Sequence, residues 1–362
     1  MKIIIACCAG LDVHKKTITA CVRRIVGDGE VVEQTLNYGT TTAELLALLD
    51  WLTKEGVTHV AMESTGVYWK PVFHILEGHL EVMLVNAHHV KHVPGRKTDV
   101  KDAQWIAELL QYGLLSPSFV PPAEIRELRD LTRQRTILVR EKATVANRIQ
   151  KVLEDANIKL ASVASDPLGV SGRAMIRGLI AGELDPATLA QRARARLRKR
   201  IPQLREALQG RVTEHHRFLL EMLMDQIEHL ERQIERFDSR IATAMAPLER
   251  VARRLETVPG IGARGAEMIV AEIGTDMGRF PSAGHLASWA GMCPGNNESA
   301  GKRRSGRTTK GTIFHAQYGR WVKRLGKKKA LVAVAHKILV LIHRLLRTET
   351  DYEERYIEEA AA

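Results

Sequence analysis

The chain has 362 residues, enough to bury more than one hydrophobic core, so we expect two or three domains. Its 54 Lys and Arg residues outnumber 42 Asp and Glu residues, which gives a net charge of +12, while aromatic residues make up only 5%. This basic excess favours a polyanionic partner, above all nucleic acid. The low aromatic content argues against a carbohydrate-binding protein or a peptide-recognition module.

Membrane, disulfide and zinc-binding classes are not indicated. No segment approaches the ~20 uncharged apolar residues that a transmembrane helix needs, and residues 1–11 are too short for a signal peptide. The four cysteines (Cys7, Cys8, Cys21 and Cys293) show no CxxC pairing. We therefore expect a cytoplasmic protein without a membrane partner.

The first third of the chain alternates strand and helix patterns. A continuous apolar run predicts a buried first strand and period-two alternation predicts the second, with a glycine turn leading into the third. Leucines on one broad face and a capping box of Thr41 with Glu44 predict the first helix. The expected strands are 3–11, 17–24, 31–38, 57–62 and 81–85, and the expected helices are 41–54, 68–77 and 99–112. This order predicts a mixed sheet of the ribonuclease H-like class within a first domain of residues 1–120.

Four carboxylates are placed at the ends of these elements. Asp12 and Glu63 each end a predicted strand, and Asp99 and Asp102 lie three residues apart on the last helix, where they share a face. Acids brought together need a counter-charge, and hard oxygen ligands suit Mg²⁺ or Mn²⁺. The alternative is that the acids have structural roles only. Asp12 would then be a turn residue, Glu63 a surface strand end, and Asp99 with Asp102 close to a capping box at the start of a helix. We favour the metal site.

Basic residues flank these acids in the sequence and predict contacts with phosphates, the alternative being a solvated charged face. They are Lys15, Lys16, Arg96 and Lys97.

The middle of the chain, residues 121–247, is predicted to be helical after a boundary at Pro121-Pro122. Apolar residues spaced 3-4-3-4 over 220–241 indicate a coiled-coil seam or one helix packed inside a bundle, and we favour self-association. The arginine run 192–200 has two equally good interpretations: it binds a nucleic-acid backbone, or it is an exposed charged helix face.

Residues 248–348 form the next predicted domain, followed by an acidic tail, 349–362. Gly260 and Gly262 precede a predicted helix, 263–273, in the manner of a helix-hairpin-helix element, where glycines let backbone N–H groups approach a phosphate. Further helices are expected at 280–290, 313–321 and 331–346.

The polar segment 294–311 carries serines among cations, as a serine nucleophile attacking a phosphodiester requires. The alternative is a basic loop that only touches backbone. Its cations are Lys302, Arg303, Arg304, Arg307 and Lys310.

Three acidic motifs and three C-terminal motifs together resemble the DEDD insertion-sequence transposases, which are bridge-RNA-guided recombinases. The acidic motifs are Gly10–Lys15, Met62–Trp69 and Lys97–Ala103; the C-terminal ones are Pro259–Gly262, Leu286–Pro294 and Glu298–Gly301. The resemblance covers roughly 6–153 and 216–345, and residues 158–211 depart from it by being longer than in short members.

The resemblance implies a domain similar to the Holliday-junction resolvase RuvC, a coiled-coil dimerisation region giving a homodimer or higher oligomer, and a C-terminal transposase domain. It implies that Asp12, Glu63, Asp99 and Asp102 bind Mg²⁺ and that Ser299 is the nucleophile, with Ser305 as its rival. The implied partners are donor DNA, target DNA and a structured guide RNA, in a nucleoid-associated protein. The alternative function is a metal-dependent junction nuclease without a covalent serine intermediate.

Overall fold

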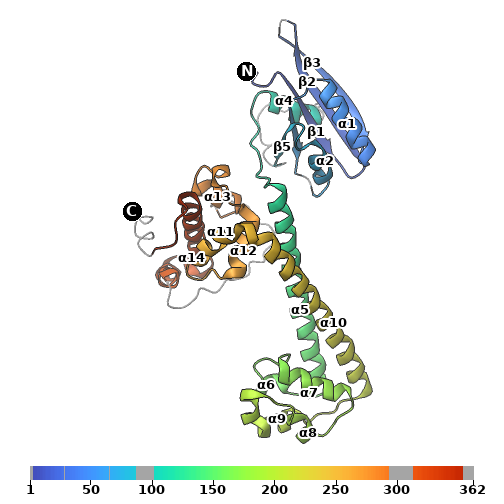
Figure 1. Ribbon diagram of the computed structural model, residues 1–362, viewed down its shortest axis with the longest axis vertical. Coiled ribbons are helices and arrows are strands. Elements are labelled where there is room, and N and C mark those ends of the chain that lie inside the picture. Colours follow the sequence, from blue (N-terminus) through green and yellow to red (C-terminus); the bar gives the residue numbers. More distant parts are fainter. Residues whose placement is uncertain (1–2, 28, 65, 87–101, 293–312, 354–362) are drawn as a thin grey trace. The chain divides into compact units, whose positions relative to one another are not determined.

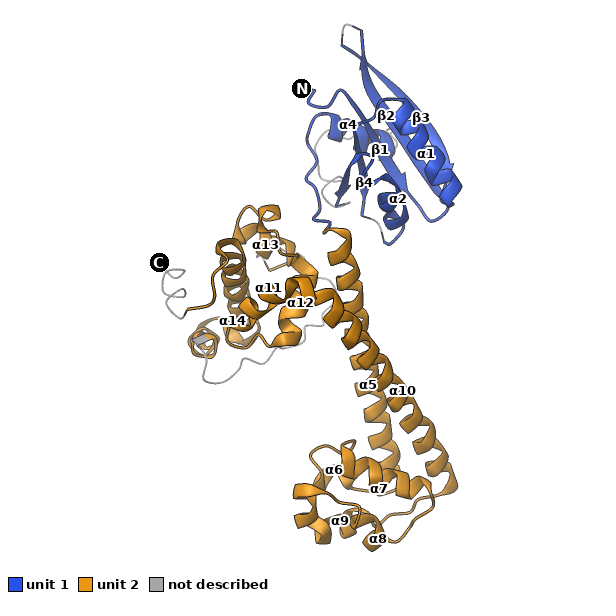
Figure 2. Cartoon of the chain, viewed as in Figure 1, with its two compact units in different colours: residues 1–120 blue, residues 121–362 orange. Residues whose placement is uncertain are grey.

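The computed structural model describes residues 3–27, 29–64, 66–86, 102–292 and 313–353. The chain divides into two compact units, residues 1–120 and residues 121–362, which are coloured separately in Figure 2. Among the described helices, none combines the length and apolar character needed to cross a bilayer.

Unit 1 is built on a five-stranded sheet in the order β3-β2-β1-β4-β5. The strands are β1 (Cys7–Val13), β2 (Thr17–Val26), β3 (Glu30–Gly39), β4 (His59–Glu63) and β5 (Glu81–Val85). β1, β2 and β3 form an antiparallel meander, whereas β4 and β5 run parallel to β1. This is the mixed ribonuclease H-like sheet that the sequence predicts, so the predicted fold class is confirmed.

Helices cover both faces of the sheet around β1. Ala9, Leu11 and Val13 pack with α1 (Thr42–Lys54) and α2 (Trp69–Leu76) on one face. Cys8 alternates with them and packs with α4 (Asp102–Gln111) on the other. Successive side chains of a strand point to opposite faces, so a strand buried on both sides must be continuously apolar. This explains why β1 is apolar from Cys7 to Leu11.

The first strand lies further along the chain than predicted. It spans Cys7–Val13 rather than 3–11, because the ladder with β2 continues through the Asp12–Thr19 and Val13–Ile18 pairs. The turn closes with the His14 backbone N–H donating to the Thr17 carbonyl at 2.9 Å. Asp12 therefore lies inside the strand, one residue before its end.

Unit 2 contains two long helices that lie side by side, α5 (Ala123–Asp155) and α10 (Glu214–Met245), as Figure 1 shows. A small helical cap, which we define as residues 157–211, connects them. It comprises α6 (Leu160–Val163), α7 (Val170–Ile180), α8 (Pro186–Ala190), η1 (Ala195–Arg200) and α9 (Ile201–Ala207).

The predicted coiled-coil seam packs within the chain. Leu220, Ile227 and Leu230 of α10 are buried in one core with Val145 and Ile149 of α5 and with residues of the cap. The alternative of one helix packed inside a bundle therefore describes these residues, and the seam is occupied by α5 rather than open to a second copy. A heptad spacing specifies an apolar stripe but does not specify which helix covers it.

Shorter helices complete unit 2: η2 (Ala246–Leu248), α11 (Glu249–Glu256), α12 (Ala263–Ile273), η3 (Met277–Arg279), α13 (Ala283–Trp289) and α14 (Ile313–Thr348). α14 is interrupted at Gly326, whose φ of 75° and ψ of 164° are not helical. The two closing helices expected from the sequence thus meet at a kink. Val258, before α12, shares a core with Val334 and Leu345 of α14.

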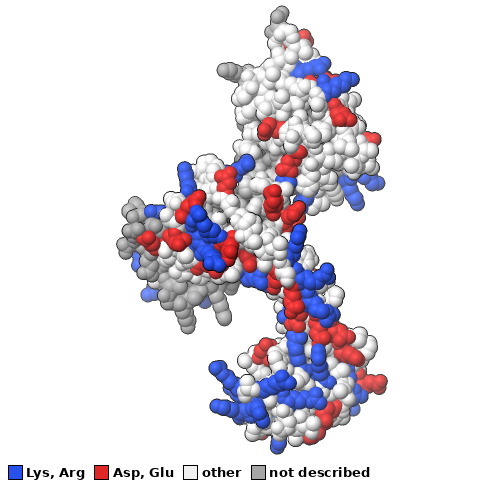
Figure 3. Space-filling view, in the orientation of Figure 1, with Lys and Arg blue, Asp and Glu red and all other residues white. Residues whose placement is uncertain are grey.

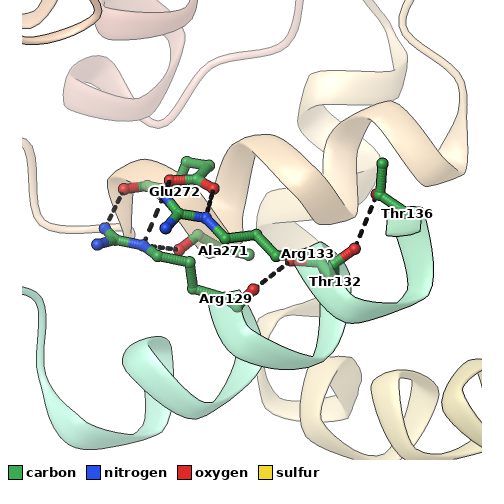
Figure 4. A network of polar contacts seen from close by, with 6 residues as sticks. All are labelled: Arg129, Thr132, Arg133, Thr136, Ala271 and Glu272. Atoms are coloured by element: carbon green, nitrogen blue, oxygen red, sulfur yellow. Dashed lines mark hydrogen bonds and ion pairs between the residues drawn. The ribbon is translucent and has the colours of Figure 1, made fainter. Parts of the chain in front are cut away.

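Two arginines fasten α12 to α5, as Figure 4 shows. Arg129 donates from Nε to the Ala271 carbonyl at 3.2 Å and from Nη2 to the Glu272 carbonyl at 2.5 Å. Arg133 holds the Glu272 carboxylate through two bonds of 2.7 Å. Cations at the carbonyl end of a helix satisfy its unpaired acceptors and oppose its dipole. The last turn of α12 is therefore fixed on the first half of α5.

We expect Arg129→Ala to lower the free energy of unfolding of unit 2 by about 2 kcal/mol, because it removes charge-assisted bonds from a mostly buried side chain. Urea unfolding of the full chain measures this change. Arg140→Ala, an exposed position on the same helix, is the matched control and should leave the midpoint nearly unchanged. Equal midpoints for the two variants would contradict the docking role of Arg129.

Candidate acidic site and its supporting elements

Asp12 and Glu63 occupy neighbouring places at the ends of two parallel strands. The last residue pair between β1 and β4 is Leu11–Met62, so Asp12 and Glu63 are each the next residue on adjacent strands. Leu11 and Met62 are fully buried on the face covered by α1 and α2. The acids, one residue further, lie on the opposite face, toward α4. Both are half-buried.

α4 lies against this face unusually closely because of Gly10. A Cβ at Gly10 would stand 2.2 Å from the Ala103 carbonyl oxygen and 2.4 Å from the Ala107 backbone nitrogen. Ala103 and Ala107 are themselves buried, in a cluster with Cys21 of β2. Small residues on the helix and on the sheet therefore allow backbone-to-backbone approach. Asp102, which begins α4, is placed by this contact.

The donor set of the site is made of carboxylate oxygens, which fit Mg²⁺ or Mn²⁺ better than softer metals. Within the described residues, however, no group of three or more His, Cys, Asp or Glu side chains is arranged to hold a metal ion. Asp99 lies outside the described residues, as do Arg96 and Lys97. The structure thus brings Asp12 and Glu63 to adjacent strands and supports Asp102 on the covering helix.

His14 contacts the site directly, which the sequence did not predict. Its Nε2 lies 3.2 Å from Oδ2 of Asp12, and its side chain is largely exposed. The tight turn between β1 and β2 brings the histidine back over the acid two residues before it. Lys15 and Lys16 are exposed in the same turn. The sequence feature that could have predicted this contact is an acid near the end of a strand with a histidine in the short turn that follows.

A buried network anchors the far end of α4. Arg23 of β2 donates from Nε to Oε1 of Gln111 at 3.0 Å and also pairs with Glu33 of β3. Gln111 is completely buried and Arg23 is 7% exposed. A buried charge requires such partners. Together with Gly10, this network sets the position of α4 on the sheet.

The glycines of the predicted hairpin join α11 to α12. Gly260 has a φ of 95°, a left-handed conformation that favours glycine, and the Ile261 backbone N–H donates to the Val258 carbonyl at 3.0 Å. Gly262 caps α12 without a side-chain hydrogen bond, and no atom lies near the place of its missing Cβ. The first N–H groups of α12 are therefore accessible to an anion.

The remaining predicted site residues lie outside the described residues. They are Ser299, Ser305, Lys302, Arg303, Arg304, Arg307 and Lys310.

Comparison with known families identifies the class of protein to which this sheet and its acids belong. Residues 9–158 match a transposase family model of the DEDD type, and residues 252–314 match the model described as transposase IS116/IS110/IS902 family. The two matches cover the acidic unit and the hairpin region. The chain belongs to this family of insertion-sequence transposases.

Individual proteins show more distant similarity. A pilin gene-inverting protein of Moraxella bovis is 27% identical over 160 residues, which cover 37% of this chain and 49% of that protein. The chain thus spans about half the length of this relative. The solved structure of RuvC from Thermus thermophilus matches 31% of this chain and 99% of its own, with 17% identity and a TM-score of 0.24.

Proposed function

We propose that the protein is a DNA recombinase that cuts and rejoins strands during transposition of an insertion sequence. The observation that carries the proposal is the placement of Asp12 and Glu63 at adjacent parallel strand ends, on the face covered by α4. Membership of a transposase family supports it, and the similarity to the pilin gene-inverting protein of Moraxella bovis points to the same chemistry.

In this proposal Asp12, Glu63, Asp99 and Asp102 hold Mg²⁺ or Mn²⁺. When bound, the ion neutralises charge on a scissile phosphate and orients its oxygens. The protein's own residues supply the rest: β1 and β4 present two acids at adjacent strand ends, and α4 presents Asp102 from the helix that covers them. Lys15, Lys16, Arg96 and Lys97 attract the DNA backbone to this edge.

Ser299 is the proposed nucleophile. Its Oγ forms a bond to the phosphorus while the bond from phosphorus to one deoxyribose oxygen breaks; that oxygen takes up a proton and the serine proton passes to solvent. A hydroxyl from another strand then attacks the phosphoserine, which restores the serine and completes the exchange. Cations of the same loop stabilise the charge on the phosphoryl oxygens. They are Lys302, Arg303, Arg304, Arg307 and Lys310.

Each part of the chain has a proposed task. Residues 1–120 hold the acids, residues 121–247 form the helical connection, residues 248–348 carry the serine and the hairpin of Gly260 and Gly262, and 349–362 are an acidic tail. We further propose donor and target DNA, a structured guide RNA and a second copy of the chain as partners, in a nucleoid-associated protein. Because α5 covers the 220–241 seam, the second copy would use other surfaces of this region.

The test is strand cleavage by full-length protein carrying Asp12→Asn or Glu63→Gln. We expect a loss of about a thousand-fold, since a metal-held transition state is stabilised by several kcal/mol. Glu81→Gln is the matched control: Glu81 starts β5, at the opposite end of the parallel strands, and should cleave normally. Undiminished cleavage by both acid variants would refute the proposed site.

A further inference from the structure

The helical cap carries a concentration of positive charge that the proposed recombination chemistry does not use. Residues 157–211 contain eleven Lys and Arg against four Asp and Glu, a net charge of +7 in a chain whose total is +12. Figure 3 shows Lys and Arg side chains gathered over this part of the surface. We name the exposed residues Arg194, Arg196, Arg198 and Lys199 the arginine ridge.

The ridge is held by its backbone and by apolar residues just before it and within it. Ala193 is 4% exposed, and Leu197 packs against the core of the cap. The Arg194 backbone N–H donates to Ser171 Oγ at 2.9 Å. Ala195 adopts a φ of 48°, which alanine rarely does, and so turns the chain sharply within the ridge. Apolar residues therefore face inward while the cations face solvent.

The ridge cations differ from the arginines that hold the cap and α12 on the long helices. Arg173 is held by Glu231 through bonds of 2.8 and 2.6 Å, and Arg177 and Arg135 pair with Glu228 and Asp238. Within the described part of the chain, no side-chain hydrogen bond or ion pair engages any ridge cation.

Three of the four acids of the cap accept hydrogen bonds from backbone N–H groups, and none of the described ion pairs joins an acid to a ridge cation. Asp185 caps α8 by accepting from the Thr188 backbone N–H at 2.9 Å, and Asp166 accepts from the Leu168 N–H at 3.1 Å. Glu183 accepts from the Asp185 N–H at 2.9 Å. Four cations within six residues that pair with no acid repel one another, and a polyanion relieves that repulsion.

The composition of the cap indicates which polyanion fits. Residues 157–211 contain no Phe, Tyr or Trp on which unpaired bases could stack, although stacking is how proteins hold single strands and looped RNA. Arginine and lysine without aromatic neighbours are suited to the regularly spaced phosphates of a double helix. DNA is the duplex that the proposed function brings to this chain.

The cap is also well placed for a second contact along such a duplex. It lies at the Asp155 end of α5, whereas α12 is docked at Arg129 and Arg133, more than 20 residues earlier on the same helix. At 1.5 Å per residue this separation is about 35 Å, close to one turn of B-form DNA.

We propose that the arginine ridge binds the phosphate backbone of duplex DNA, independently of base sequence and of the acidic site. This inference rests on the proposed function only for the identity of the duplex.

The test measures binding of the full-length chain to a fluorescent DNA duplex of arbitrary sequence at several salt concentrations. Arg194→Gln/Arg196→Gln/Arg198→Gln removes three ridge charges without touching the backbone anchor. We expect at least about tenfold weaker binding at low salt. The slope of log affinity against log salt concentration should decrease in magnitude by about 2 to 3, because each lost phosphate contact lowers that slope by about 0.9.

The matched control, Arg232→Gln/Arg236→Gln/Arg240→Gln, removes the same charge from the exposed face of α10. The salt dependence of its DNA affinity should stay near that of the parent. An equal loss of affinity in both variants would show a general charge effect and would overturn the proposal. A variant that loses affinity only for an RNA duplex of equal length would also overturn it. Loss of cleavage in Asp12→Asn reports on the acidic site, whereas loss of duplex affinity in the ridge variant reports on the ridge, so failure of the proposed function and failure of this inference give different results.

Discussion

Replacing Ser299 by Ala is expected to abolish strand exchange and, with it, any covalent protein–DNA species. Without the hydroxyl no phosphoserine forms, and the loss should be about a thousand-fold or more, as for other nucleophile deletions. The measurement is a denaturing gel of the reaction with labelled DNA, in which an adduct migrates with the protein. The variant should still bind DNA, because it retains every cation of the 294–311 segment.

Ser305→Ala is the matched control for this prediction, since it removes the same group from the same segment. We expect adduct and exchange close to those of the parent. An adduct that persists in Ser299→Ala and disappears in Ser305→Ala would reassign the nucleophile to Ser305. Cleavage that proceeds in both variants without any adduct would favour a metal-dependent junction nuclease that uses only the acids.

The sheet could be predicted because its pattern is local. β1 is apolar from Cys7 to Leu11 because both its faces are covered there, and β2 and β3 follow across short turns. Once β4 is read as parallel to β1, their ends must adjoin, so the proximity of Asp12 and Glu63 follows from strand order alone. The strand bounds were predicted less well: the first strand was misplaced at both ends, as 3–11 instead of Cys7–Val13, because ladder pairing and not apolar character decides where a strand begins and ends.

Contacts between distant segments could not be predicted in this way. The spacing of Leu220 to Ile241 defines a stripe, but α5 and a second copy of α10 would satisfy that stripe equally well. Arg23 and Gln111 were unremarkable in sequence, 88 residues apart, and became partners only when α4 closed over the sheet. The contact of His14 with Asp12 likewise depends on the turn that follows the strand.

The close approach of α4 to β1 depends on Gly10, so the acidic site is expected to be sensitive to substitution at this position. Every atom within 3.0 Å of the missing Cβ of Gly10 belongs to the backbone of α4, at Ala103 and Ala107. Backbone atoms cannot rotate away as a long side chain would. A methyl group at Gly10 must therefore push the helix from the sheet by about 1 Å to reach ordinary contact distances.

We expect Gly10→Ala to lower the free energy of unfolding by about 1–3 kcal/mol, the usual cost of overpacking. Cleavage should fall about a hundred-fold, because Asp102 begins the displaced helix and a misplacement of about 1 Å has that effect on a reacting assembly. Thermal unfolding and cleavage below the unfolding temperature measure the two effects separately.

Gly319→Ala is the control for this substitution. Gly319 is exposed on α14 and no neighbouring atom lies near its missing Cβ, so alanine there should be neutral or slightly stabilising. Adding Ala107→Gly to Gly10→Ala should not restore cleavage, since the obstructing atoms are main-chain atoms that glycine retains. Rescue by that second change would show that side-chain crowding, and not the distance between helix and strand, controls the position of Asp102.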